Sequence, residues 1–135
     1  MTKTRFTVAA LTLAAFALTA ALHSARAIAG EAGHSHRAQH GGKVIESGHH
    51  HLEIVAKDGT LEVYVNGEDG KPEDVAGAKA TAAVLSGGKK FDVTLAAAGN
   101  SLTGSGDFKA SKGTTIVVTL TMPGHSPEQS RVTLD

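Results

Sequence analysis

The sequence predicts an all-β fold, a small antiparallel β-sandwich of immunoglobulin-like size with seven to eight short strands. Short runs that alternate apolar and polar residues follow one another from Lys43 to the end of the chain. Glycine, asparagine, aspartate or proline separates these runs, as expected between short strands. No amphipathic pattern long enough for a useful helix interrupts them. A small closed barrel is the alternative architecture.

Eight runs qualify as strands by this alternation. They lie at residues 43–46, 50–57, 60–66, 79–86, 89–97, 101–104, 114–122 and 130–134. The run at 79–86 gives the weakest signal, because its alanines also favour helix. The run at 114–122 is apolar on both faces, which predicts a central place in the sheet. Asp58-Gly59 predicts a two-residue type I′ hairpin.

Residues 1–27 have the composition of a secretory signal peptide. Two basic residues precede an apolar run at 6–22, and small residues follow at Ala25, Ala27 and Ala29. A membrane anchor is the alternative, but the apolar run is short for a spanning helix of about 20 residues. We therefore expect cleavage after Ala27 or Ala29 and a periplasmic protein with no stable membrane anchor.

The exported chain then has two parts, a flexible His-rich arm at 28–42 and a β-sandwich domain at 43–135. Removal of the leader leaves ten basic against 13 acidic residues. Nucleic acid is an unsuitable partner for such a surface, since phosphate binding needs clustered Lys and Arg. The chain has no cysteine, which excludes thiolate metal sites and a cysteine nucleophile.

Histidine is the residue type that points to a function. Six of the eight histidines lie within 20 residues: His34, His36, His40, His49, His50 and His51. Neutral imidazole is the commonest protein ligand for borderline transition metals. The stretch from 34 to 53 therefore predicts a metal-binding segment. The alternative is a soluble, His-rich surface arm.

The strand at 50–57 suggests how the ligands are arranged. Side chains two apart on a strand share a face about 6.5–7 Å apart, so His49, His51 and Glu53 point the same way. A tight turn at Ser47-Gly48 would pair this strand with 43–46 and bring the chain back beside its start. The two glycines after His40 would let its imidazole fold over the sheet.

The predicted site is therefore His40, His51 and Glu53, with one more imidazole or a water. Glu53 is expected to bind the ion or to orient a ligand. Such a set suits Zn²⁺, Cu²⁺, Ni²⁺ or Co²⁺, with zinc or copper foremost. We expect His49, His50, His34 and His36 only to assist.

Other motifs in the sequence give weaker indications of function. His125 follows Met122, and a Met–His pair suits Cu(I), but Met122 is the only methionine of the exported chain. The acidic loop at 66–74 lacks the spacing of an EF-hand. Gly87-Gly88-Lys89 is not a P-loop, and no nucleophile elbow or H-E-x-x-H helix occurs. We expect a protein that is not an enzyme.

The run from 40 to 72 resembles small periplasmic proteins encoded with heavy-metal efflux systems. It is also similar to the N-terminal module of periplasmic adaptor subunits of resistance-nodulation-division metal exporters. The shared pattern is H-G-G, a short strand, H-x-E-[LI]-V, D-G-x-L-x-[VL]-Y and a G-K-P loop. The matching residues are His40, Gly41, Gly42, His51, Glu53, Ile54, Val55, Asp58, Gly59, Leu61, Val63, Tyr64, Gly70, Lys71 and Pro72. The adaptor's hairpin, lipoyl and barrel segments are absent.

This resemblance implies metal handling in the periplasm, without fixing the metal. The first hypothesis is a binding protein that buffers divalent transition metal ions or delivers them to a heavy-metal efflux system, with the periplasmic adaptor of the efflux pump as its candidate partner. The second is a non-enzymatic β-sandwich interaction module of the cell envelope with no specific metal site.

Overall fold

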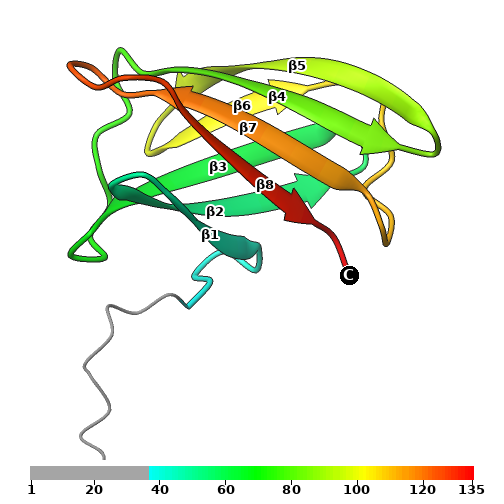
Figure 1. Cartoon of the computed structure of the whole chain (residues 1–135), viewed down its shortest axis with the longest axis horizontal. Helices are drawn as coiled ribbons and strands as arrows, with labels where there is room; N and C mark the ends of the chain where they lie inside the picture. Colours follow the sequence, from blue (N-terminus) through cyan, green and yellow to red (C-terminus); the bar gives the residue numbers. More distant parts are fainter. Residues whose placement is uncertain (1–36) are drawn as a thin grey trace, which may run out of the picture.

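The computed structural model describes residues 37–135, which form an all-β fold of eight antiparallel strands (Figure 1). This confirms the predicted fold class, and each predicted strand is present. The strands are β1 (Lys43–Ser47), β2 (His50–Lys57), β3 (Thr60–Gly67), β4 (Lys79–Ser86), β5 (Lys89–Ala98), β6 (Ser101–Ser105), β7 (Thr115–Thr121) and β8 (Glu128–Thr133). No helix able to cross a membrane occurs in this part of the chain.

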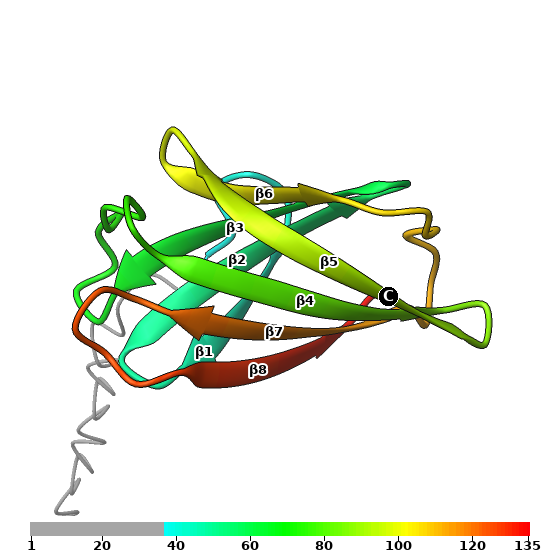
Figure 2. The same cartoon turned by 90° about the horizontal axis from the view of Figure 1, so that it is seen from above.

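The strands form one strongly curved sheet in the order β1-β2-β3-β6-β5-β4-β7-β8. β5 connects the two halves of the sheet. Its first part pairs with β4 as far as Leu95, and its last three residues, Ala96 to Ala98, pair with β6. The β1-β2-β3 half therefore faces the β4-β7-β8 half across the core (Figure 2). The architecture lies between the predicted sandwich and the alternative barrel.

The barrel is nearly closed where β8 lies beside β1 (Figures 1 and 2). The ladders within residues 37–135 do not join these two strands. Side chains bridge them instead. Lys43 Nζ donates to the Thr133 carbonyl at 2.8 Å, and Ser130 Oγ donates to the Glu46 carbonyl at 3.2 Å. This seam brings β8 close to the hairpin that carries the histidines.

Alternating residues from both halves fill the core. Leu61, Val63 and Val65 of β3 are buried, as are Ile116, Val118 and Leu120 of β7. β7 pairs with β4 on one side and β8 on the other, as its composition predicts. Val117 is only half-buried, because its outward face has no second layer over it.

The first hairpin turns one residue later than predicted. Ser47 pairs with His50, so the turn is Gly48-His49 and not Ser47-Gly48. Gly48 has a φ of 55°, which suits glycine as the first central residue of a two-residue hairpin. His49 consequently lies in the turn, and His50 becomes the first residue of β2.

The second hairpin is present, but its predicted type is wrong. Lys57 pairs with Thr60 across Asp58-Gly59. A type I′ turn needs positive φ at both central residues, and only Gly59 has it, at 74°. Asp58 is held from outside the turn, because its carboxylate accepts hydrogen bonds from the Ala110 amide at 2.9 Å and Lys109 Nζ at 3.2 Å.

Candidate metal centre

The segment before β1 crosses the outer face of the sheet at β2 and β3. Gly42 lies so close to β2 that a Cβ there would collide with the Ile54 carbonyl. Glycine is therefore required for this approach. The predicted fold of the His40-Gly41-Gly42 loop over the sheet is confirmed. Residues 39–42, the end of the predicted arm, are fastened to β2.

Glu53 is the residue that fastens them. Its side chain is 1% exposed although it lies on the outer face of β2. Oε1 accepts the amides of His40 at 2.7 Å and Gly42 at 2.9 Å. Oε2 accepts the Gln39 amide at 2.9 Å and contacts His40 Nδ1 at 2.9 Å. Burial alone would raise the pKa of Glu53, but these hydrogen bonds together hold it below its ordinary value.

The imidazole of His40 is held on two sides. It stacks on the Tyr64 ring with centroids 3.6 Å apart and planes 1° apart. Its Nδ1 faces the Glu53 carboxylate. Since the carboxylate can only accept, Nδ1 carries the hydrogen and Nε2 keeps its lone pair. The side chain is 37% exposed, so the ring is both oriented and accessible.

His51 lies on the same outer face, one residue pair along from Glu53. It pairs in register with Asn66, whereas Glu53 pairs with Tyr64. Its Nδ1 donates to the Gly67 carbonyl at 3.2 Å. The structure thus joins His40 to Glu53 and places His51 on the same face. With both oxygens of Glu53 occupied, the carboxylate is arranged to orient His40 rather than to bind an ion.

His49 does not share that face, contrary to the prediction, because the turn removes it from the strand. It pairs with Glu68 through Nδ1 at 2.7 Å. This hydrogen bond with Glu68 and the charge of that carboxylate raise the pKa of His49. His34 and His36 lie outside the described residues.

A second group of histidines lies at the end of the barrel. His50 faces inward with Leu52 and Ile54 and is 2% exposed. Its Nδ1 meets Glu128 Oε2 at 2.9 Å, and its Nε2 lies 3.5 Å from Glu73 Oε2. The His125 ring meets it edge to face, with centroids 5.3 Å apart.

These side chains border an open hollow of about 430 Å³, here called the end depression. Its lining is His49, His50, Gly67, Glu68, Asp69, Glu73 and His125. Sequence reasoning missed this group. Glu128 is 78 residues from His50 along the chain, so no local spacing connects them. The only signal was His125, for which the sequence offered Met122 as a partner and nothing from β2.

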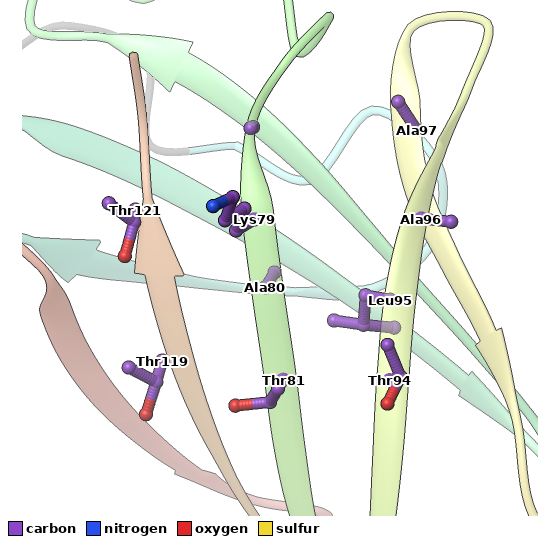
Figure 3. A pocket seen from close by; sticks show the side chains of 10 residues that line it. Lys79, Ala80, Thr81, Thr94, Leu95, Ala96, Ala97, Thr119 and Thr121 are labelled. Carbon is purple, nitrogen blue, oxygen red and sulfur yellow. The ribbon is translucent and has the colours of Figure 1, made fainter. Parts of the chain in front are cut away.

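A hollow of about 460 Å³ also opens where β5 leaves β4 (Figure 3). Small residues line most of it, with threonines from β4, β5 and β7 beside alanines of β4 and β5. Lys79 is the only charged residue in its lining. This hollow offers no side chain suited to bind a metal cation.

Among the described residues, the side chains of a type suited to bind a metal cation gather in the two histidine groups beside β2. Among residues 37–135, no three His, Asp or Glu side chains already converge tightly enough to enclose an ion. Comparison with family models, with curated proteins and with solved structures gave no match.

Proposed function

We propose that this protein binds divalent transition metal ions in the periplasm, zinc or copper foremost, and buffers them or delivers them to a heavy-metal efflux system. The ligands we assign are His40 and His51 on the outer face of β2, with water completing the coordination. Glu53 orients His40. The His-rich arm, with His34 and His36, and the turn residue His49 assist capture.

One observation carries this proposal, the contact between buried Glu53 and His40 Nδ1. Metal-binding histidines usually donate their second ring N–H to a carboxylate or carbonyl, which fixes the tautomer and makes the ligand more basic. His40 has this arrangement, and its Nε2 edge is accessible. If Glu53 served only to hold the loop before β1, hydrogen bonds from the backbone amides would be enough. The stacking of the His40 imidazole on Tyr64 is not required for that role.

His51 is the second ligand because of its place on β2. Neighbouring rows on one face of a strand are about 6.5–7 Å apart. Two Zn–N bonds of about 2.0–2.1 Å span about 4 Å, so the imidazoles on the Tyr64 row and the Asn66 row must lean toward each other to share an ion. Two nitrogens and solvent leave open positions on the ion, which suits a protein that releases its metal to a partner.

The role in efflux is supported by the resemblance of residues 40–72 to the efflux-associated proteins, and by the signal-like segment 1–27. Both residues at the centre of the contact, His40 and Glu53, belong to the resembling pattern. So does Tyr64, the ring on which His40 stacks.

Calorimetric titration of the untagged protein with Zn²⁺ and Cu²⁺ tests the proposal. We expect His40→Ala with His51→Ala to lose a tight site while the protein stays folded, because neither side chain belongs to the core. The matched pair His34→Ala with His36→Ala should remove only weaker equivalents. Binding should weaken as the pH falls through about 6.5, because only neutral imidazole binds metal.

Two results would reject the proposal. Equal losses of affinity in both double variants would mean loose chelation by the His-rich arm. No change in either variant would leave Glu53 as a structural clasp and favour the interaction module of the cell envelope.

A further inference from the structure

We infer that the end depression is a second, separate metal site, in which His50 Nε2, Glu73 and His125 bind a borderline divalent ion such as Zn²⁺ and Glu128 positions His50. It lies across β2 from the proposed site of His40 and His51, because His50 faces inward and those two face outward. It does not depend on the proposed function for its ligands.

The spacing of His50 and Glu73 fits an ion between them. His50 Nε2 and Glu73 Oε2 are 3.5 Å apart. Two ligand atoms on a tetrahedral zinc ion, with bonds of about 2.0–2.1 Å, lie roughly 3.3 Å apart. A small movement of the Glu73 side chain, which is 38% exposed, therefore accommodates the ion.

Glu128 prepares His50 for this role. It meets Nδ1 at 2.9 Å and is itself only 16% exposed. The Glu128 carboxylate can only accept, so Nδ1 donates its hydrogen there, and Nε2 is the ring nitrogen directed at Glu73. This carboxylate–histidine arrangement is the one that supports a metal-binding imidazole.

Two glycines make room for the two carboxylates. A Cβ on Gly48 would collide with the Glu128 carboxylate, and one on Gly67 would lie 2.7 Å from Glu73 Oε1. Glu73 is also fixed through its backbone, because its amide donates to the Val65 carbonyl at 2.9 Å. Both carboxylates thus reach His50 through gaps that any larger residue would fill.

His125 supplies the third ligand from the turn that joins β7 to β8. Its backbone is fixed, since its amide donates to the Met122 carbonyl at 3.0 Å. Its exposed ring already touches the His50 ring edge to face, so a rotation about its side-chain bonds turns a nitrogen toward the ion. Met122 is buried in the core and is not a ligand. Glu68 and Asp69 also border the mouth, where they pair with His49 and Lys71.

The test uses zinc titration in a background that lacks the other site and the arm ligands. This background carries His34→Ala, His36→Ala, His40→Ala and His51→Ala. We expect it to keep one equivalent of Zn²⁺. Adding His125→Ala or Glu73→Gln should weaken that binding at least tenfold, and Glu128→Gln about 10–100-fold. Glu46→Gln is the control for Glu73→Gln, because Glu46 is an exposed carboxylate of β1 outside the lining of the end depression, and its replacement should change affinity less than about twofold.

Replacing the buried His50 by alanine can prevent folding, so NMR of the folded background protein provides an independent test. Nitrogen NMR of the background protein should show Zn²⁺ shifting Nε2 of His50 while Nδ1 stays protonated, and Glu128→Gln should disturb that tautomer. No bound zinc in the background, or equal losses for Glu46→Gln and Glu73→Gln, would overturn the second site. The first site is judged separately, by whether His40→Ala with His51→Ala removes the tight site from a protein that is otherwise wild type.

Discussion

Glu53 is the residue on which the outer histidine site depends. A carboxylate that is 1% exposed is stable there only because four donors face it, three of them backbone amides. The same contacts close the loop before β1 and set the ring of His40. The Glu53 side chain therefore both stabilises the fold and orients the proposed ligand His40.

Glu53→Gln should lower the free energy of unfolding by about 1–3 kcal/mol at pH 7, because the amide group presents hydrogens to donors that then lack an acceptor. The pKa of Glu53 is lowered on folding from 4.5. Its ionised form thus stabilises the fold fully above that value, and this contribution is lost as the pH falls through the folded pKa. Urea unfolding should show the gap between wild type and variant shrinking below about pH 4.5.

Glu46→Gln is the control for that experiment. Glu46 lies on the neighbouring strand and is exposed, so its replacement should change stability by less than about 0.5 kcal/mol. A pH-independent gap for Glu53→Gln would mean that the carboxylate charge does not hold the loop.

The hairpin of β1 and β2 determines the direction in which His49, His50 and His51 point. Its Gly48-His49 turn puts His49 outside the strand, sends His50 inward and leaves His51 outward. The turn also receives the Glu128 carboxylate from β8 across the seam. Gly48 therefore serves both the backbone conformation and the approach of a side chain.

Gly48→Ala and Gly87→Ala form a matched pair. Both glycines have similar φ, 55° and 57°, so each alanine should cost about 1–2 kcal/mol of backbone strain. Only a Cβ at Gly48 meets another group, the Glu128 carboxylate; nothing lies within 4 Å of one at Gly87. Zinc affinity at the end depression should fall in Gly48→Ala alone. Similar affinities in the two variants would show that Glu128 does not position His50.

The inward-facing side chains of β7 pack in the hydrophobic core. Val118→Asp should unfold the domain, because an unpaired buried charge costs several kcal/mol, out of the roughly 5–15 kcal/mol that stabilises a domain. Thr119→Asp is its neighbour control on the outward side and should leave the fold intact. Circular dichroism during urea titration compares them, and a folded Val118→Asp protein would contradict the assignment of this face.

At the scale of the whole molecule, the curved sheet brings distant segments to one end of the barrel. The turn before β8, the loop after β3 and the start of β2 meet there, so the end depression exists only in the closed fold. The outer histidine group is held by contacts within residues 39–67, whereas the inner group also needs Glu128 of β8.

Export is the prediction that belongs to the whole chain. The mature N-terminus should be Ile28 or Gly30, because small residues precede both positions after the apolar run. Mass spectrometry of periplasmic material measures this directly. An intact protein that begins at Met1 would contradict export with cleavage.

Sequence pattern predicted the strands well because each depends on local alternation, and it predicted that His51 and Glu53 share a face for the same reason. It also anticipated that His40 folds over the sheet, since Gly41 and Gly42 permit it. The turn at Gly48-His49 was missed by one residue, which misplaced His49. Glu73, Glu128 and His125 could not be assigned, because only closure of the barrel brings them to His50.

The most direct test of the account is the position of a bound ion. Crystals of the untagged protein grown with Zn²⁺ should give an anomalous-scattering peak about 2.0–2.1 Å from His40 Nε2, with the Glu53 carboxylate still on Nδ1. Zinc found only along the His-rich arm, or a His40 ring that keeps its contacts with Glu53 and Tyr64 without any ion, would contradict the central claim.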